Sequence, residues 1–327
     1  MKRLLVIAAT LLGMAALLFL GLWWSLQQFL AAPLPLSQPL TLVVSKGAGL
    51  AAITQQLSNA GVIGHPLLFR LGTMWMGRTK ALQAGEYAFE PGMSHRLLID
   101  KMALGEVVVH RFTLVEGRTV RQLLDELKAE PALEGEVGPL PGEGRLLPET
   151  YNFILGETRS QMIARMQRAM DQALMEAWNG RDEGLLLSSP TELLILASIV
   201  ERETGLAAER PHVAAVFHNR LKKGMRLQSD PTAIYALSDG LGVLERPLSR
   251  ADLENPSPFN TYVVDRLPPA PIANPGRASL MAVAHPQVSN DLYFVADGTG
   301  GHVFAATLEA HNQNVARWRQ IEKERGK

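Results

Sequence analysis

The chain opens with an apolar run that is long enough to cross a membrane. Lys2 and Arg3 are followed by uncharged, mostly apolar residues that continue to Trp23 and Trp24. A helix of about 20 such residues, rising about 1.5 Å per residue, spans a hydrocarbon layer of roughly 30 Å. We therefore expect residues 1–25 to form a transmembrane anchor.

A cleaved signal peptide is the alternative interpretation of this run. The run is longer than the usual apolar segment of a signal peptide, and no convincing small-x-small cleavage site follows it. The proline-rich residues 26–39 are expected to form a spacer without helical periodicity. Because the next charged residue after Arg3 is Lys46, the positive-inside rule predicts a cytoplasmic N-terminus and places the chain after Trp24 outside the cytoplasmic membrane.

Three segments then share one pattern of an extended run, a glycine and a helical segment. They cover residues 41–57, 85–102 and 111–127, with turn glycines Gly47, Gly92 and Gly117. The sixth and tenth residues after each glycine are apolar, namely Ile53 and Leu57, Leu98 and Met102, and Leu123 and Leu127. A spacing of four puts both residues on one helix face, so we predict strand-turn-helix units packed on a small sheet. Core architecture explains the pattern, and a carbohydrate-binding module is an equally weighted alternative.

A helix that is apolar on every side is predicted after Ser189. Ser189 is a favourable N-cap, Pro190 suits the first helical position, and Glu192 completes a capping box. No residue from Leu193 to Val200 is charged, so this helix is expected to lie buried in the centre of its domain. Gly205 is expected to end it.

The last turn of this helix carries two carboxylates, Glu201 and Glu203. The negative end of the helix dipole and an apolar wall both disfavour an ionised carboxylate, and a general acid needs a raised pKa. The two side chains point about 200° apart, so one can face a cleft while the other pairs with Arg202, Arg210 or solvent. An ordinary helix end with two solvated glutamates is the simpler interpretation.

Polar groups that suit sugar binding follow this helix. A second amphipathic helix is predicted from its apolar face, Val213, Val216, Phe217 and Leu221. After it come the polar residues Gln228, Ser229 and Asp230, and then the proline-rich residues 255–276, whose stiff backbone carries Asn260, Thr261, Tyr262 and Asn274. An Asp-Gly hairpin within residues 292–306 and a last helix capped by Thr307 close the domain.

Composition and motifs exclude several other functions. Lys plus Arg and Asp plus Glu both number 32, so the chain has no basic surplus for nucleic acid, which is not expected as a partner. The chain contains no cysteine, which excludes disulfides and thiolate chemistry. Its histidines, among them His212, His218, His285 and His302, lack an HExxH spacing, and there is no P-loop lysine and no G-x-S-x-G motif. We therefore expect no metal and no cofactor.

Several stretches resemble one known family. "ASIVERET", "VFHNRLKKGMRLQSDPT", "NTYVVDRLPPAPIANPG" and "LYFVADGTGGHVF" are similar to membrane-anchored endolytic murein transglycosylases, the MltG or YceG-like family, over most of residues 110–320. The resemblance implies an α+β fold, with a small LysM-like subdomain at 40–110 and a larger mixed catalytic domain at 111–327. It implies that Glu201 is the catalytic acid/base. The polar candidates for sugar binding remain Gln228, Ser229, Asp230, Asn260, Thr261, Tyr262 and Asn274.

The resemblance also implies an activity and a location. The enzyme would cleave the bond between N-acetylmuramic acid and N-acetylglucosamine in nascent peptidoglycan strands, leave 1,6-anhydro ends and terminate glycan elongation. It would lie in the bacterial inner membrane, with its catalytic domain on the periplasmic side and with peptidoglycan synthases as partners. Two alternatives stay open: a hydrolytic muramidase in which Asp230 or Glu149 activates water, and a membrane-tethered glycan-binding scaffold of the cell-wall synthesis machinery.

Overall fold

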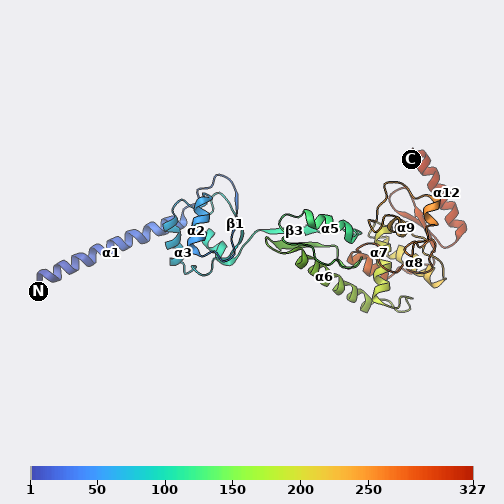
Figure 1. The fold of residues 1–327 in the computed structure, drawn as a ribbon, viewed down its shortest axis with the longest axis horizontal. Coiled ribbons are helices and arrows are strands. Elements are labelled where there is room, and N and C mark those ends of the chain that lie inside the picture. The colour runs from blue at the N-terminus through green and yellow to red at the C-terminus, as the bar shows by residue number, and fades with distance from the viewer. Residues whose placement is uncertain (1, 327) are drawn as a thin grey trace. The chain divides into compact units, whose positions relative to one another are not determined.

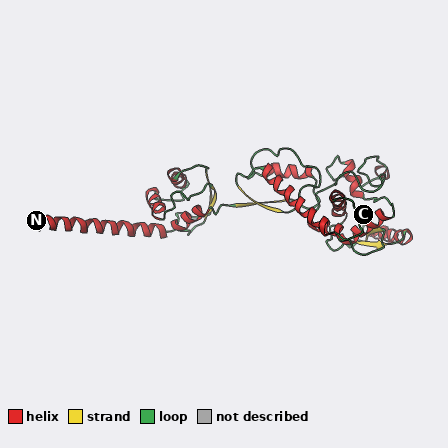
Figure 2. Cartoon of the chain, turned by 90° about the horizontal axis from the view of Figure 1, so that it is seen from below, coloured by secondary structure: helices red, strands yellow, loops and turns green. Residues whose placement is uncertain are grey.

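The computed structural model describes residues 2–326 and has a mixed α+β fold, as predicted (Figure 1). Helices make up most of the regular structure, and the strands are short (Figure 2). The chain divides into two compact units. Unit 1 comprises residues 1–110 and 152–155, and unit 2 comprises residues 111–151 and 156–327.

Helix α1, Lys2–Ala31, contains the expected apolar span, Leu5–Ala31, whose mean hydropathy is 2.5. Within residues 2–326 it is the one helix that is long and apolar enough to cross a membrane. The predicted spacer differs from the structure, because the helix continues to Ala31. Leu26, Phe29 and Leu30 are buried in the core of unit 1. Their i, i+3, i+4 spacing is helical, and the prolines that suggested a spacer begin only at residue 33.

Unit 1 contains the first two strand-turn-helix units. Strand β1, Leu40–Val44, pairs antiparallel with β2, Gly85–Phe89, from Leu40 opposite Phe89 to Val44 opposite Gly85. The helices are α2 (Leu50–Asn59), α3 (Pro66–Trp75) and α4 (His95–Leu104). The four predicted apolar positions are buried, which confirms the predicted faces: Ile53, Leu57, Leu98 and Met102.

The third strand-turn-helix unit has a different strand partner. Strand β3, Val109–Thr113, pairs with β4, Thr150–Ile154, so the expected single small sheet is two separate two-stranded sheets. Helix α5, Val120–Ala129, belongs to unit 2, where Leu123 and Leu127 are fully buried. The turn glycine Gly117 has a φ of 76°, the left-handed region that favours glycine. The shared pattern thus predicts the local units but not which strands pair.

Unit 2 is built around helix α7, Pro190–Glu203, which packs against α6, α8, α9 and α11. Every residue from Leu193 to Val200 is buried, as the apolar run predicts. The other elements are α6 (Arg159–Gly180), α8 (Arg210–Lys222), α9 (Asp230–Leu237), α10 (Arg250–Leu253), α11 (Arg277–Ala284), β5 (Tyr293–Ala296), β6 (His302–Ala305) and α12 (Leu308–Glu324). The β5–β6 hairpin and the Thr307 cap on α12 are confirmed.

The ends of α7 differ in detail from the sequence prediction. The Ser189 hydroxyl accepts from the Glu192 amide as expected, but the Glu192 carboxylate accepts from the Ser188 amide, at 2.7 Å, so the capping box is only half formed. At the other end Thr204 adopts an extended conformation while its amide still bonds to Val200. The helix therefore ends at Glu203, two residues before Gly205, which does not adopt the left-handed conformation of a glycine stop.

Burial of the end of α1 predicts that unit 1 loses stability when this packing is removed. Leu30→Ala should lower the free energy of opening of α2 and α4 by about 2–5 kcal/mol, because Leu30 is fully buried. Hydrogen exchange on the full chain measures this opening. Gln28→Ala is the matched control, since Gln28 is exposed on the same helix. Unchanged protection in Leu30→Ala would mean that residues 26–31 act as an independent spacer after all.

Candidate active site

The last turn of α7 points its two glutamates into different surroundings within unit 2. The Glu201 side chain is 3% exposed. Its Oε1 accepts a hydrogen bond from Arg210 at 3.0 Å, and its Oε2 accepts one from the Gly276 amide at 2.8 Å. Arg210 also pairs with Glu116 at 2.9 Å. Both oxygens of Glu201 are therefore bound within the protein, and this carboxylate joins α7 to α8 and to the loop before α11.

Gly276 is required by this arrangement. A Cβ atom at residue 276 would lie 2.1 Å from Oε1 of Glu116, which is far inside a normal contact distance. The missing side chain lets the backbone amide approach the Glu201 carboxylate while Glu116 stays on Arg210. The surroundings of Glu201 thus have the character of a structural junction.

Glu203, the last residue of α7, has different neighbours and keeps partial access to solvent. Burial raises the pKa of Glu203 to about 7, and the negative charge of Asp230 adds to the rise. The hydroxyl of Ser229 and the positive charge of Arg220 oppose the rise. A carboxyl that keeps its proton near neutral pH has a pKa suited to a general acid.

Asp230 and Tyr262 form a hydrogen-bonded pair beside Glu203. The Tyr262 hydroxyl donates to Oδ1 of Asp230 at 2.6 Å. Burial and the nearby charge of Asp230 both raise the pKa of Tyr262, so its hydroxyl stays a neutral donor. Asp230 is exposed and Tyr262 is partly exposed. These two predicted binding residues are accessible, and the charge of Asp230 acts on the enclosed carboxyl of Glu203.

Gln228 lies just before this pair and is exposed. Its φ is 49°, which is uncommon for a residue other than glycine. The backbone amide of Gln228 donates to the Thr261 carbonyl at 3.1 Å, and this bond connects the chain here to the proline-rich loop. Unusual backbone conformations of this kind cluster at functional sites.

The remaining predicted binding residues are buried and hold loops together. The Thr261 hydroxyl lies 2.9 Å from the Ser229 amide, which donates to it, and 2.8 Å from the Thr232 hydroxyl. The Asn260 amide group donates to the carbonyls of Leu253 and Asn255. These contacts fix the loop that carries Tyr262, and they leave Ser229, Asn260 and Thr261 at most 1% exposed.

Asn274 has the same structural character. It is fully buried, its Nδ2 donates to the Arg118 carbonyl at 2.9 Å, and its Oδ1 accepts from the Leu146 amide at 3.0 Å. The structure therefore brings three of the seven predicted binding residues, Gln228, Asp230 and Tyr262, to the surface near Glu203. The other four support the segments around them.

Comparison with known proteins agrees with this architecture. A model of the YceG-like family matches residues 42–317, which is most of the chain. The chain belongs to the YceG-like family. A crystal structure of a YceG-like protein from Listeria monocytogenes is 31% identical, with a TM-score of 0.52, and covers 84% of this chain and 99% of that chain.

Curated relatives of this YceG-like chain share one name. A Bacillus subtilis (strain 168) protein named endolytic murein transglycosylase is 31% identical over 301 residues, which cover 83% of this chain and 82% of the relative. A protein of the same name from Streptococcus pneumoniae serotype 2 (strain D39 / NCTC 7466) is 28% identical over 352 residues, covering 92% of this chain. The chain spans 63% of the length of that streptococcal relative.

Sequence reasoning missed Arg220, which acts on Glu203 in the YceG-like site. Its side chain is buried, and its guanidinium donates to the carbonyls of Leu292 and Leu227, each at 2.6 Å. The guanidinium also lies 5.4 Å from the centre of the Tyr293 ring. The sequence signal that could have indicated Arg220 is its positive charge within α8, a helix whose residues are mostly buried.

A second carboxyl of the YceG-like chain was also missed. Burial raises the pKa of Glu143 to about 7. Its Oε1 accepts from the Val120 amide at 2.9 Å, and the Tyr235 hydroxyl lies 3.5 Å from its Oε2. The Asn274 amide group is 3.5 Å from Oε1. Glu143 thus links the start of α5 to α9 and to the loop of Asn274, but nothing in the glycine-rich segment around it indicated this burial.

The raised pKa of Glu203 predicts a pH-dependent stability difference. The shift from 4.5 to about 7 means that the folded protein holds the proton more tightly than the unfolded chain, so this group destabilises the fold as pH rises through 7. Glu203→Gln removes this titration. The free energy of unfolding of the variant, relative to that of wild type, should be about 3 kcal/mol higher at pH 8 than at pH 4. Urea unfolding at the two pH values measures this difference.

Glu183→Gln is the control for this measurement, since Glu183 is exposed in the same unit. It should follow the wild-type curve at both pH values. If the stability of Glu203→Gln changed with pH as that of wild type does, the conclusion that Glu203 is enclosed and protonated near neutral pH would be wrong.

Proposed function

We propose that this chain is an endolytic lytic transglycosylase of peptidoglycan. Its substrate is the bond between N-acetylmuramic acid and N-acetylglucosamine in nascent glycan strands, and its products carry 1,6-anhydro-N-acetylmuramic acid ends. The observation that carries the proposal is the enclosed Glu203 carboxyl, whose pKa is raised to about 7 beside the exposed residue Asp230. The name of the relatives, endolytic murein transglycosylase, supports the same substrate class.

One carboxyl of adjustable protonation is sufficient for this chemistry. The protonated acid gives its proton to the glycosidic oxygen as the bond to C1 of N-acetylmuramic acid breaks. The resulting carboxylate then takes the proton of the C6 hydroxyl of the same sugar, whose oxygen attacks C1 and closes the anhydro ring. The substrate supplies the nucleophile, no water enters the products, and the acid returns to its starting state.

We assign this role to Glu203, and not to Glu201, the residue that the family resemblance implied. A catalytic acid needs a proton to give and an oxygen that reaches the substrate. Glu201 has both oxygens engaged, one of them by the Arg210 guanidinium, and its side chain is almost fully enclosed. Glu203 has a raised pKa and lies close enough to the exposed residue Asp230 to be influenced by its charge.

The residues beside Glu203 take supporting roles. The negative charge of Asp230 helps to keep the proton on Glu203 and would stabilise positive charge that develops at C1 in the transition state. Tyr262 holds the Asp230 carboxylate in place and offers a ring face to a sugar. Gln228 is the third exposed group available for sugar hydroxyls. Ser229, Asn260, Thr261 and Asn274 keep these groups in position.

The location of the enzyme follows from helix α1. We assign α1 as a single-pass anchor in the bacterial inner membrane, with Lys2 and Arg3 in the cytoplasm and the chain after Trp24 on the periplasmic side. Release of strands at this surface would terminate glycan elongation close to the peptidoglycan synthases, the proposed partners. Residues 40–110 are proposed to be a LysM-like subdomain, and residues 111–327 the catalytic domain.

A hydrolytic muramidase is the second candidate, and one observation favours it. Asp230 provides a second carboxylate close enough to influence Glu203, and a muramidase uses such a pair. In that mechanism Asp230 would activate water or attack C1, and the products would carry reducing ends. Identification of the product ends separates the two reactions.

Replacing the catalytic carboxyl predicts a clear loss of activity. Glu203→Gln cannot donate or accept the proton, so the release of 1,6-anhydro-ended fragments from purified peptidoglycan should fall by about 10²–10⁴. The measurement is mass spectrometry of the fragments released by the full chain in detergent. Circular dichroism confirms that the variant is folded.

Glu201→Gln is the matched comparison on the same helical turn. It removes a charge from the Arg210 pair, so it should lower the melting temperature while retaining most of the activity below that temperature. A dead Glu201→Gln beside an active Glu203→Gln would reverse the assignment. Reducing ends that disappear in Asp230→Asn would favour the muramidase, and the absence of released fragments from the wild type and every variant would favour the glycan-binding scaffold.

The proposed orientation has its own test. A reporter enzyme that is active only in the cytoplasm, fused after Lys327, should give no signal in cells, because the cationic end of α1 stays inside. A reporter active only in the periplasm, fused at the same position, should give a strong signal. The opposite pair of results would reverse the orientation.

A further inference from the structure

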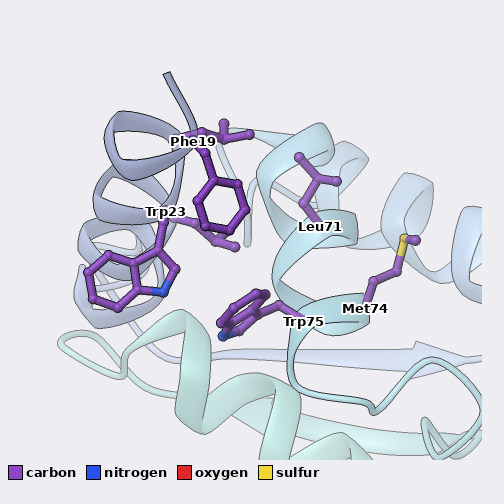
Figure 3. Close-up of a pocket in the computed structure, with 7 residues that line it drawn as sticks. Phe19, Trp23, Leu71, Met74 and Trp75 are labelled. Atoms are coloured by element: carbon purple, nitrogen blue, oxygen red, sulfur yellow. The ribbon is translucent and has the colours of Figure 1, made fainter. Parts of the chain in front are cut away.

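An apolar groove of about 340 Å³ lies between helices α1 and α3 of unit 1 (Figure 3). Phe19, Leu22 and Trp23 line it from α1, and Leu71, Met74 and Trp75 line it from α3. In the close-up, Trp23 and Trp75 face each other across the groove, and Phe19 lies at the level of Leu71. The two helices thus present one continuous apolar surface.

This surface is too exposed for a protein surrounded by water alone. The exposed fraction is 61% for Phe19, 42% for Trp23, 58% for Met74 and 55% for Trp75. Contiguous apolar patches of this kind mark interaction or membrane surfaces. Because half of the lining belongs to the proposed membrane anchor, lipid is the solvent that already surrounds part of the groove.

The depth of the groove can be placed along α1. A span of about 20 residues that starts at Leu5 ends near Trp24, where an aromatic residue suits the boundary between hydrocarbon and headgroups. Phe19 and Leu22 then lie at the outer edge of the hydrocarbon layer. The residues of α3 that face them lie at the same depth.

Helix α3 cannot move away from this depth independently, because it is packed against the end of α1. A Cβ atom at Gly72 would lie 2.8 Å from Cδ2 of Leu30, so the absence of a side chain at Gly72 lets the two helices approach closely. Leu30 itself is fully buried in the unit 1 core. Wherever α1 leaves the bilayer, α3 therefore lies beside it.

Charge along this part of the chain favours a surface of phosphate groups. The first acidic residue in the sequence is Glu86, whereas Arg70 and Lys80 flank the α3 surface and are exposed. Within residues 2–326 neither of these two cations forms an ion pair, while Arg78 is paired with Asp100. Exposed cations beside aromatic and aliphatic residues are typical of helices that lie in the membrane interface.

We propose that α3 lies in the outer interface of the bilayer and that lipid acyl chains fill the groove between α1 and α3. Leu71, Met74 and Trp75 enter the edge of the hydrocarbon layer, and Arg70 and Lys80 bind lipid phosphates. Unit 1 is thereby held against the membrane surface by two helices. This proposal rests on the proposed anchor role of α1 and is independent of the catalytic assignment.

The absence of cysteine from the chain gives a direct test. Single cysteines at Leu12, Met74 and Val43 are labelled with an environment-sensitive fluorophore, in the full chain reconstituted into vesicles of phosphatidylethanolamine and phosphatidylglycerol. Lipids with a nitroxide on the acyl chain quench fluorophores that lie in the hydrocarbon edge. Leu12 is an exposed position in the span, and Val43 is 51% exposed on β1, at the end of unit 1 away from the entry of α1 (Figure 1).

We expect the Met74→Cys label to be quenched several-fold more than the Val43→Cys label, and Leu12→Cys to be quenched strongly. Quenching at Leu12→Cys with none at Met74→Cys would overturn the groove proposal and leave the anchor intact. No quenching at Leu12→Cys would overturn both. Cross-linking of Met74→Cys between two copies, without lipid quenching, would show that a second copy of the chain covers the groove, and would also overturn the proposal.

Discussion

The burial of α7 is the constraint on which the candidate site depends. A helix that is apolar on every side must be enclosed, and α6, α8, α9 and α11 enclose it. Its rotation and its end point are therefore fixed by packing on all sides. The ion pair between Glu201 and Arg210 and the bond from the Gly276 amide add a polar fixing point in the last turn. Glu203, two residues further, lies at the end of this helix near Asp230 and Ser229.

Two glutamates on one helical turn thus acquire different chemistry from their surroundings alone. A guanidinium and an amide occupy the oxygens of Glu201, whereas Glu203 lies near a second carboxylate in a largely enclosed position. Burial beside a second carboxylate is how a protein keeps a proton on one carboxyl near neutral pH. The Ser229 hydroxyl and, to a smaller extent, the positive charge of Arg220 limit the rise in the pKa of Glu203.

In unit 1 the comparable constraint is the packing of α1. The final turns of this helix contribute Leu26, Phe29 and Leu30 to the unit 1 core, so no flexible segment separates the apolar span from the folded unit. The exposed residues of α3 follow from the same packing, because Gly72 holds that helix against Leu30. A membrane helix joined in this way also determines the environment of the unit that follows it.

Local periodicity in the sequence determined the helix faces and the buried positions of this protein. The paired apolar residues of the strand-turn-helix units, the enclosed run Leu193–Val200 and the β5–β6 hairpin were all predictable, because each depends on residues close together in the chain. Sequence periodicity also showed that only one of Glu201 and Glu203 could face a cleft.

Only the tertiary structure decided which partners surround each glutamate and which polar residues are accessible. The partners that engage Glu201 are nine residues away, at Arg210, and 75 residues away, at Gly276. Asn274 bonds to the carbonyl of Arg118, 156 residues away, and this contact removes it from the surface. Spacing within a helix or loop carries no information about such contacts, because they depend on how distant segments pack against one another.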